Sequence, residues 1–170
     1  STINQAITHS PPNVSITPSS ATLDCSVTST TLTAGGGVSY VWSNGLPSTV
    51  SNSVSTPNTY TITVTDANGC TGSASSIVTQ NVTPPTAAVS SSSSTITCLT
   101  PSVTLTASGG GTYNWGGGVT TITKTVNAAG AYTVTVTGSN GCTATASSII
   151  GLNTTAPTAS VSPNSATVTC

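Results

Sequence analysis

The chain repeats itself with a period of 72 or 73 residues. Thr31–Trp42 (TLTAGGGVSYVW) returns after 73 residues as Thr104–Trp115 (TLTASGGGTYNW). Thr59–Cys70 (TYTITVTDANGC) returns after 72 residues as Ala131–Cys142 (AYTVTVTGSNGC). A period of this length indicates a series of small domains, and such an array commonly serves as a rod, spacer or fibre rather than as a catalyst.

The repeat predicts two complete domains and two partial ones. Residues 10–82 and 83–154 are each expected to form one domain. Residues 1–9 are expected to be the last strand of a preceding repeat, and residues 155–170 the first strands of a following one. We therefore expect the sequence to be a window cut from a longer array.

The composition favours a folded β protein that does not bind charged partners. Hydrophobic residues make up 35% of the chain and charged residues 2%, with a net charge of −1. One Lys and no Arg give no electrostatic surface for nucleic acid or an anionic membrane. The sequence contains no run of about 18 apolar residues, so it predicts no membrane-spanning segment. A chain with so little charge tends to self-associate, which suits a fibre.

Alternating patterns predict β-strands throughout the chain. Strand signals recur about every ten residues with turn residues between them, which is the spacing of a β-sandwich. In Thr59–Asp66, the side chains of Tyr60, Ile62 and Val64 share one face because side chains alternate across a strand. No segment has apolar residues at helical spacing. The sequence thus predicts an all-β fold of Ig-like sandwich domains, arranged head to tail, with essentially no helix.

Glycines mark two kinds of turn in each repeat. Asn68-Gly69 and Asn140-Gly141 are predicted to supply the positive φ angles of a tight hairpin between the last two strands. The triplets Gly35–Gly37 and Gly109–Gly111 lie between strands and lack a phosphate-loop pattern. We interpret these triplets as sharp corners of the sandwich.

Each repeat has one Trp and, further along, a Tyr that opens the penultimate strand. Trp42 and Trp115 are expected to fill the core between the sheets, as a single Trp does in Ig-like sandwiches. Tyr60 and Tyr132 are expected to belong to the core and to form tyrosine corners. The alternative is that these rings are exposed and stack on sugars.

These motifs resemble the PKD-like and Ig-like tandem repeats of giant cell-surface proteins of the Bacteroidetes, including their gliding-motility adhesins. Tyr60–Cys70 and Tyr132–Cys142 carry most of the resemblance, and the two tryptophans support it. The resemblance implies export through the cell envelope and attachment at the cell surface. It implies no particular ligand, because such arrays often act as stalks for other modules. The hairpin of these repeats is often D-x-N-G-C, which Asp66–Cys70 keeps and Gly138–Cys142 lacks.

Two cysteines per repeat indicate a disulfide framework and hence an oxidising, extracellular setting. The five cysteines are Cys25, Cys70, Cys98, Cys142 and Cys170. A metal site would need further ligands clustered around the thiols. His9, Asp24 and Asp66 are the residues that could provide them, and none of the three recurs with the repeat. We therefore expect no metal.

The sequence leaves three pairing patterns open. Pairing within repeats would join Cys25 to Cys70 and Cys98 to Cys142. The topology of a sandwich, however, places Cys25 and Cys70 at opposite poles, separated by strands of roughly 33 Å, whereas a disulfide needs Cα atoms within about 7 Å. A Cys25–Cys142 disulfide across the domain junction is therefore favoured, with Cys98 and Cys170 paired to units outside the sequence. The third pattern is pairing between chains.

The repeat preserves no catalytic constellation. It contains no nucleophile–base pair and no recurring pair of carboxylates, so we expect neither an enzyme nor a cofactor. Three N-x-S/T patterns, which begin at Asn13, Asn81 and Asn153, are candidate glycosylation sites.

The sequence therefore predicts a structural function at the cell surface: the shaft of a bacterial adhesin or extracellular filament, built from disulfide-stapled repeats. The expected partners are neighbouring repeats of the same chain and, in a fibre, identical chains. The main alternative is an adhesive module that binds a glycan or a surface, which would expose Trp42 and Trp115. A remoter alternative is an ice-binding face formed by outward rows such as Thr61, Thr63 and Thr65.

Overall fold

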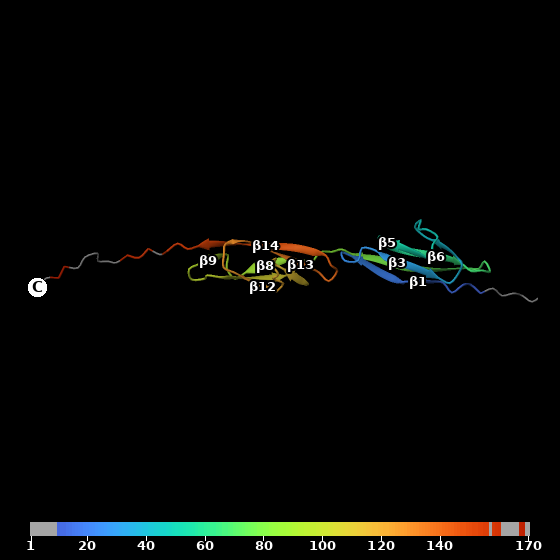
Figure 1. Ribbon diagram of the computed structural model, residues 1–170, viewed down its shortest axis with the longest axis horizontal. Helices are drawn as coiled ribbons and strands as arrows, with labels where there is room; N and C mark the ends of the chain where they lie inside the picture. Colours follow the sequence, from blue (N-terminus) through green and yellow to red (C-terminus); the bar gives the residue numbers. More distant parts are fainter. Residues whose placement is uncertain (1–9, 157, 161–166, 169–170) are drawn as a thin grey trace, which may run out of the picture. The chain divides into compact units, whose positions relative to one another are not determined.

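The computed structural model describes residues 10–156, 158–160 and 167–168. These residues form strands and loops, and no helix occurs among them (Figure 1). The all-β fold is therefore confirmed. The strand expected in residues 1–9, and Cys170 with any disulfide it forms, lie outside the described residues.

The chain divides into two compact units. The first comprises Ser1–Pro85 together with Thr137–Thr143, and the second comprises Thr86–Val136 together with Ala144–Cys170. The short segment Thr137–Thr143 lies within the second copy of the sequence repeat, yet its contacts place it in the first unit.

The first unit contains strands β1 to β7 in two sheets. Their bounds are β1 Ser15–Thr17, β2 Ser20–Asp24, β3 Thr30–Gly35, β4 Ser39–Trp42, β5 Ser51–Val54, β6 Asn58–Thr65 and β7 Thr71–Asn81. One sheet is antiparallel and has the order β1-β3-β5. The other has the order β2-β7-β6-β4, in which only β2 and β7 are parallel. This is the arrangement of an immunoglobulin-like sandwich, in which two sheets enclose one core.

The second unit has the same topology. Its strands are β8 Ala88–Ser91, β9 Thr95–Thr97, β10 Val103–Ser108, β11 Thr112–Asn114, β12 Thr123–Val126, β13 Gly130–Thr137 and β14 Thr143–Asn153. Its sheets have the orders β12-β10-β8 and β11-β13-β14-β9, and β9 runs parallel to β14. Each strand therefore has the place of its counterpart in the first unit, as the sequence repeat requires.

Each unit buries the inward residues of both sheets in its own core. The first core contains Ile16, Leu23, Leu32, Ala34, Trp42, Val54, Tyr60, Ile62, Val64 and Val78. The second contains Ile96, Val103, Leu105, Ala107, Trp115, Val126, Val134, Val136 and Ile150. The alternation predicted along β6 is observed, because Tyr60, Ile62 and Val64 are buried while Thr63 between them is exposed. The cores consist mostly of β-branched and leucine side chains around one Trp.

The glycine triplets form corners at which two backbone segments come close together. A Cβ atom on Gly36 would lie 2.3 Å from the carbonyl oxygen of Asn13, and one on Gly109 would lie 2.4 Å from that of Thr86. Both glycines also have positive φ, at 109° and 135°. No side chain fits at either position, in agreement with the interpretation of the triplets as corners.

The Asn-Gly hairpins differ from the prediction. Positive φ for both residues of each pair is wrong, because only the glycines have it, at 81° for Gly69 and 72° for Gly141. In the first hairpin, the backbone N–H of Asp66 donates to Cys70 O, and that of Gly69 donates to Asp66 O. The loop is therefore longer than a two-residue turn. In such a loop only one residue occupies the left-handed region, and glycine takes it.

Candidate functional site

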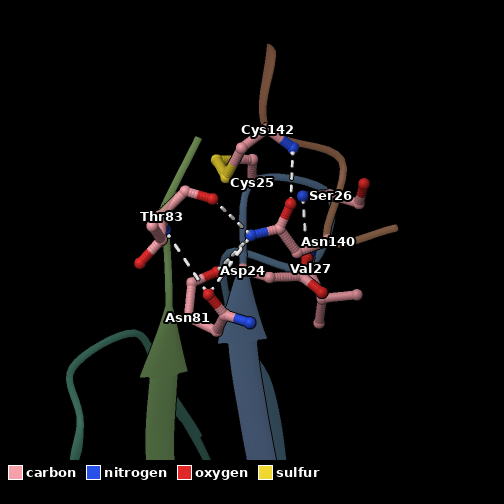
Figure 2. Close-up of a disulfide and its surroundings, with 8 residues drawn as sticks. All are labelled: Asp24, Cys25, Ser26, Val27, Asn81, Thr83, Asn140 and Cys142. Carbon is pink, nitrogen blue, oxygen red and sulfur yellow. Dashed lines mark hydrogen bonds between the residues drawn. A yellow bond between two sulfur atoms is a disulfide. The ribbon is translucent and has the colours of Figure 1, made fainter. Parts of the chain in front are cut away.

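Cys25 and Cys142 form a disulfide, although 117 residues separate them in the sequence. Their Cα atoms are 5.0 Å apart. Cys25 directly follows β2, and Cys142 lies in the loop between β13 and β14, which belongs to the first compact unit (Figure 2). Because Cys25 is bonded to Cys142, neither Cys25–Cys70 nor Cys98–Cys142 forms.

The side chain of Asn140 anchors this loop. Its Nδ2 atom donates to the backbone oxygen of Asn81 at 3.2 Å, to the side-chain oxygen of Asn81 at 3.2 Å and to the backbone oxygen of Thr83 at 2.9 Å (Figure 2). Its backbone oxygen accepts from the N–H of Cys25 at 3.1 Å. The disulfide therefore lies beside a set of hydrogen bonds that holds the loop in place. We call Cys25, Asn81 and Thr83 acceptor site 1, and residues 138–142 the bound loop.

A turn after β2 presents Cys25 to the bound loop. The backbone N–H of Asp24 donates to Val27 O, and one carboxylate oxygen of Asp24 accepts from the N–H groups of Ser26 and Val27 at 2.8 and 2.7 Å (Figure 2). An aspartate that accepts from the backbone two or three residues ahead is a common way to fix a turn. Asp24 thus has a structural role beside the disulfide.

The bound loop approaches the turn so closely that only glycine fits at position 141. A Cβ atom there would lie 1.8 Å from Ser26 Oγ and 3.0 Å from the backbone nitrogen of Ser26. The loop is also partly covered from solvent: Ser139 is exposed, whereas Cys142 is only 2% exposed. The bound loop and the turn after β2 are therefore closely packed against each other as well as joined by the disulfide.

Two cysteines in the described part of the chain carry free thiols. Cys70 is half-buried and Cys98 is exposed. Cys70 is the counterpart of Cys142 in the repeat, and Cys98 is the counterpart of Cys25. The first repeat therefore has a free counterpart of Cys142, and the second repeat has a free counterpart of Cys25.

The two tryptophans are buried and their indole nitrogens are satisfied. Trp42 is 5% exposed and Trp115 6%. The indole N–H of Trp42 donates to Thr49 O at 2.8 Å, and that of Trp115 donates to Thr121 O at 3.0 Å. Neither ring offers a free face to a sugar. The one-residue difference between the two repeats therefore lies in the loop between each Trp and its acceptor.

The two tyrosines hold the entry to the penultimate strand of each unit. The hydroxyl of Tyr60 donates to Thr56 O at 2.9 Å, and that of Tyr132 donates to Ala128 O at 2.7 Å. Both acceptors lie four residues upstream, which is the geometry of a tyrosine corner. Tyr60 is buried, whereas Tyr132 is half-buried.

The single cation of the chain packs on Tyr132. The ammonium of Lys124 lies 5.7 Å from the centroid of that ring and donates to Trp115 O at 3.3 Å. Its counterpart in the first unit, Asn52, donates to Pro47 O at 2.9 Å. Both side chains therefore fasten the loop after the Trp strand. The sequence repeat alone did not reveal this role, because Lys and Asn share no chemical pattern.

The outward Thr rows are one strand wide. Thr63 on β6 has Val41 of β4 on one side and Ser73 of β7 on the other. The hydroxyl of Thr61 is hydrogen-bonded to that of Ser75 at 2.9 Å. The face is therefore a mixture of Thr, Ser and Val, which gives no regular array of threonines.

The sequon asparagines have different surroundings. Asn81 is part of acceptor site 1, and Asn153 has the same place at the end of β14. Asn13 is exposed near the corner at Gly36. Glycosylation of these residues stays a prediction. The anchoring role of Asn81 and Asn140 was missed by the sequence analysis, although the recurrence of Asn81 as Asn153, and of Thr83 as Thr155, was a signal for it.

Neither a metal cluster nor a membrane helix is found in the described parts of the chain. The described residues contain no group of three or more His, Cys, Asp or Glu side chains that could hold a metal ion. They also contain no helix that is long and apolar enough to span a membrane.

Comparison with known proteins gives likenesses of fold. No protein-family model matches the chain, and no curated protein matches it. Among solved structures, it is similar to a 1.5-MDa bacterial ice-binding adhesin, with 16% identity, coverage of 88% of this chain and 67% of that chain, and a TM-score of 0.49. It is also similar to three N-terminal domains of the highly immunogenic outer capsid protein of bacteriophage RB49, with 18% identity, coverage of 84% and 59%, and a TM-score of 0.45. A third similarity, to fibronectin(III)-like modules of Clostridium thermocellum CbhA, has 10% identity, coverage of 82% and 94%, and a TM-score of 0.35.

Proposed function

We propose that this chain is part of the extracellular shaft of a bacterial surface protein, in which Ig-like repeats follow one another and disulfides staple each repeat to the next. The observation that carries the proposal is the Cys25–Cys142 disulfide, because it closes a loop that contains most of both sequence repeats. A shaft must keep its length under tension. A covalent bond across so long a loop limits how far the chain can extend.

The strand order suits this role. β2 lies near the start of the first unit and pairs in parallel with β7, which lies near the end of its repeat. While the Cys25–Cys142 disulfide is intact, β7 and β9 lie inside its loop and carry no load. When it is reduced, tension applied to the two ends of a repeat pulls β2 and β7 in opposite directions along their length. Their hydrogen bonds are then loaded together rather than one after another. The parallel pair β9 and β14 gives the second unit the same resistance.

The same disulfide supports secretion into an oxidising compartment. Structural disulfides form and persist outside the cytosol. The composition also suits this setting. The chain is rich in Ser and Thr and has a net charge of only −1, so its electrostatic interactions change little with salt concentration. The resemblance to PKD-like repeats of Bacteroidetes surface proteins adds that the parent protein is attached at the cell surface.

The main alternative, an adhesive module, is disfavoured by the aromatic side chains. Sugar-binding modules need exposed rings, whereas Trp42 and Trp115 are in the cores. We propose that this part of the protein holds a binding module away from the cell and has no ligand or catalytic activity of its own.

Surface display tests the proposal. The full chain is fused between an outer-membrane anchor and a carbohydrate-binding module of known specificity, and cells are exposed to shear flow over a glycan-coated surface. We expect adhesion that depends entirely on the terminal module. We also expect a Cys25→Ser/Cys142→Ser variant to lose its terminal module to protease several times faster. Adhesion of cells that display the chain without a terminal module would overturn the shaft in favour of the adhesive module.

A further inference from the structure

The second unit contains a counterpart of acceptor site 1. In the first unit, β2 and β7 pair in parallel with Asp24 opposite Asn81. In the second unit, β9 and β14 pair in parallel with Thr97 opposite Asn153. Cys98 follows Thr97 directly, as Cys25 follows Asp24. We call Cys98, Asn153 and Thr155 acceptor site 2.

The turn that presents the cysteine is the same at both sites. The backbone N–H of Thr97 donates to Thr100 O at 3.1 Å, as that of Asp24 donates to Val27 O at 2.8 Å. The hydroxyl of Thr97 accepts from the N–H groups of Leu99 and Thr100, as the Asp24 carboxylate accepts from its own turn. A different side chain therefore fixes an equivalent turn.

The two backbone acceptors are also arranged alike. At site 1, the N–H of Thr83 donates to the side-chain oxygen of Asn81 at 3.4 Å. At site 2, the N–H of Thr155 donates to that of Asn153 at 3.2 Å. This local turn sets the direction of the carbonyl groups at both sites, and at site 1 those carbonyls receive the amide of Asn140.

Acceptor site 2 is an open pocket at the position that the bound loop fills in site 1. Its lining residues are Thr97, Cys98, Leu99, Asn153, Thr155 and Ala156. Cys98 there has a free, exposed thiol, and Leu99 is 94% exposed. Covering an apolar side chain that is so exposed to water lowers the free energy. The pocket, the thiol and the apolar side chain all face the place where a loop would bind.

The chain also carries a loop that fits this pocket. Asp66–Cys70 has the same closing hydrogen bonds as the bound loop: Asp66 N–H to Cys70 O at 2.9 Å, beside 2.8 Å for Gly138 N–H to Cys142 O. Both loops present Asn-Gly-Cys. In Asp66–Cys70, however, Asn68 and Gly69 are exposed, whereas their counterparts in the bound loop are half-buried.

We propose that acceptor site 2 binds the loop Asp66–Cys70 of a second copy of this chain, and that Cys98 and Cys70 then form a disulfide between the copies. The amide of Asn68 donates to the carbonyls of Asn153 and Thr155. Each copy offers one acceptor site and one loop at different places on its surface. The contact is therefore heterologous, and it adds copies in one direction without closing on itself in pairs.

The disulfide requires an oxidant, and a low-molecular-weight disulfide such as glutathione disulfide serves. The thiolate of one cysteine attacks glutathione disulfide, forms a mixed disulfide and releases one glutathione. The thiolate of the other cysteine attacks the protein sulfur of the mixed disulfide and releases the second glutathione. The two thiols lose two protons and two electrons, and glutathione disulfide takes them up. In an array in which disulfides staple each repeat to the next, the following repeat would fill acceptor site 2, so the contact between copies applies where that site is open. It needs only the loop and the pocket and does not depend on the shaft role.

The test is oxidation of the purified full chain with Cys170→Ser, which removes the fifth cysteine, and with its Cys25–Cys142 disulfide intact, in a glutathione buffer at high protein concentration. We expect a ladder of covalent oligomers on non-reducing gels and a Cys70–Cys98 peptide in the mass spectrum. Cys98→Ser should abolish the ladder, and a mixture of Cys98→Ser and Cys70→Ser chains should stop at the dimer.

A second variant separates a fitted site from mere thiol reactivity. Asn68→Ala should lower the yield of the Cys70–Cys98 disulfide about tenfold, which is the effect of about one net hydrogen bond. Asn114→Ala, at an exposed asparagine that ends β11, should not change the yield. Dimers joined by Cys70–Cys70 or Cys98–Cys98 in preference, glutathionylated monomers without a ladder, or equal yields for the two asparagine variants would overturn the proposal.

Discussion

Single residues in this chain act through the hydrogen bonds that they complete inside the cores. The indole of Trp42 and the phenol of Tyr60 are each buried with their polar atom bound to a backbone carbonyl. A buried carbonyl that loses its donor costs more than an exposed one, because water cannot replace the donor. The aromatic residues that the repeat preserves therefore fasten loops to the sheets as well as filling space.

Tyr60→Phe tests the tyrosine corner. The substitution keeps the ring and removes the hydroxyl that donates to Thr56 O. We expect the free energy of unfolding to fall by about 1–2 kcal/mol. Urea unfolding followed by far-UV circular dichroism measures the change.

Tyr113→Phe is the control, because the Tyr113 ring is half-buried against the second core and, among the described residues, its hydroxyl has no hydrogen-bond partner. We expect a change of less than about 0.5 kcal/mol there. Equal effects of the two substitutions would mean that the hydroxyl of Tyr60 contributes nothing to the corner.

At the scale of elements, the two Asn-Gly-Cys loops show how one motif has two environments. Both connect the last two strands of a repeat and both have one glycine with positive φ. The loop that ends at Cys142 is bound at acceptor site 1, whereas the loop that ends at Cys70 is exposed. The difference between them is therefore a matter of contacts rather than of backbone conformation.

Gly141→Ala and Gly69→Ala form a matched pair. Both put a non-glycine residue at positive φ, which costs about 1–2 kcal/mol. At position 141 the new Cβ would also lie 1.8 Å from Ser26 Oγ, whereas at position 69 no atom lies within 4 Å. We expect Gly141→Ala to lower the equilibrium constant for forming the Cys25–Cys142 disulfide with glutathione disulfide at least about tenfold. We expect Gly69→Ala to leave this equilibrium constant unchanged.

Titration of the full chain with mixtures of reduced and oxidised glutathione, followed by mass spectrometry of alkylated peptides, gives both equilibria. If Gly141→Ala changed the Cys25–Cys142 equilibrium no more than Gly69→Ala, the close approach of the bound loop to Ser26 would be refuted.

The sequence predicted the elements well and their contacts less well. Alternation along strands such as Asn58–Thr65 located the sheets, because the burial of one face leaves a direct trace in residue order. The hairpin type was wrong, since Asn-Gly fits both a two-residue turn and a longer loop with one left-handed residue. The role of Asn140 depends on partners 57 and 59 residues away in the sequence. The role of Lys124 could not be predicted because its counterpart Asn52 shares no chemical pattern with it.

At the scale of the molecule, the disulfide between Cys25 and Cys142 determines how much chain can be released by unfolding. The bond bridges 117 residues. In the chain-entropy view, closing a loop of this size stabilises the folded state by about 5 kcal/mol. Under tension its effect is more direct, since the residues inside the loop cannot extend while the bond is intact. A chain with this disulfide therefore stays short even after its domains have unfolded.

Single-molecule pulling of the full chain by its two ends tests this account most directly. We predict that unfolding of the oxidised chain releases only the residues outside the loop. A thiol reductant added under tension should then release about 400 Å in one step, which is 117 residues at about 3.5 Å each. Release of the whole chain length without reductant would contradict the account. A reductive step of about 160 Å, expected for a Cys25–Cys70 pair, would contradict it equally.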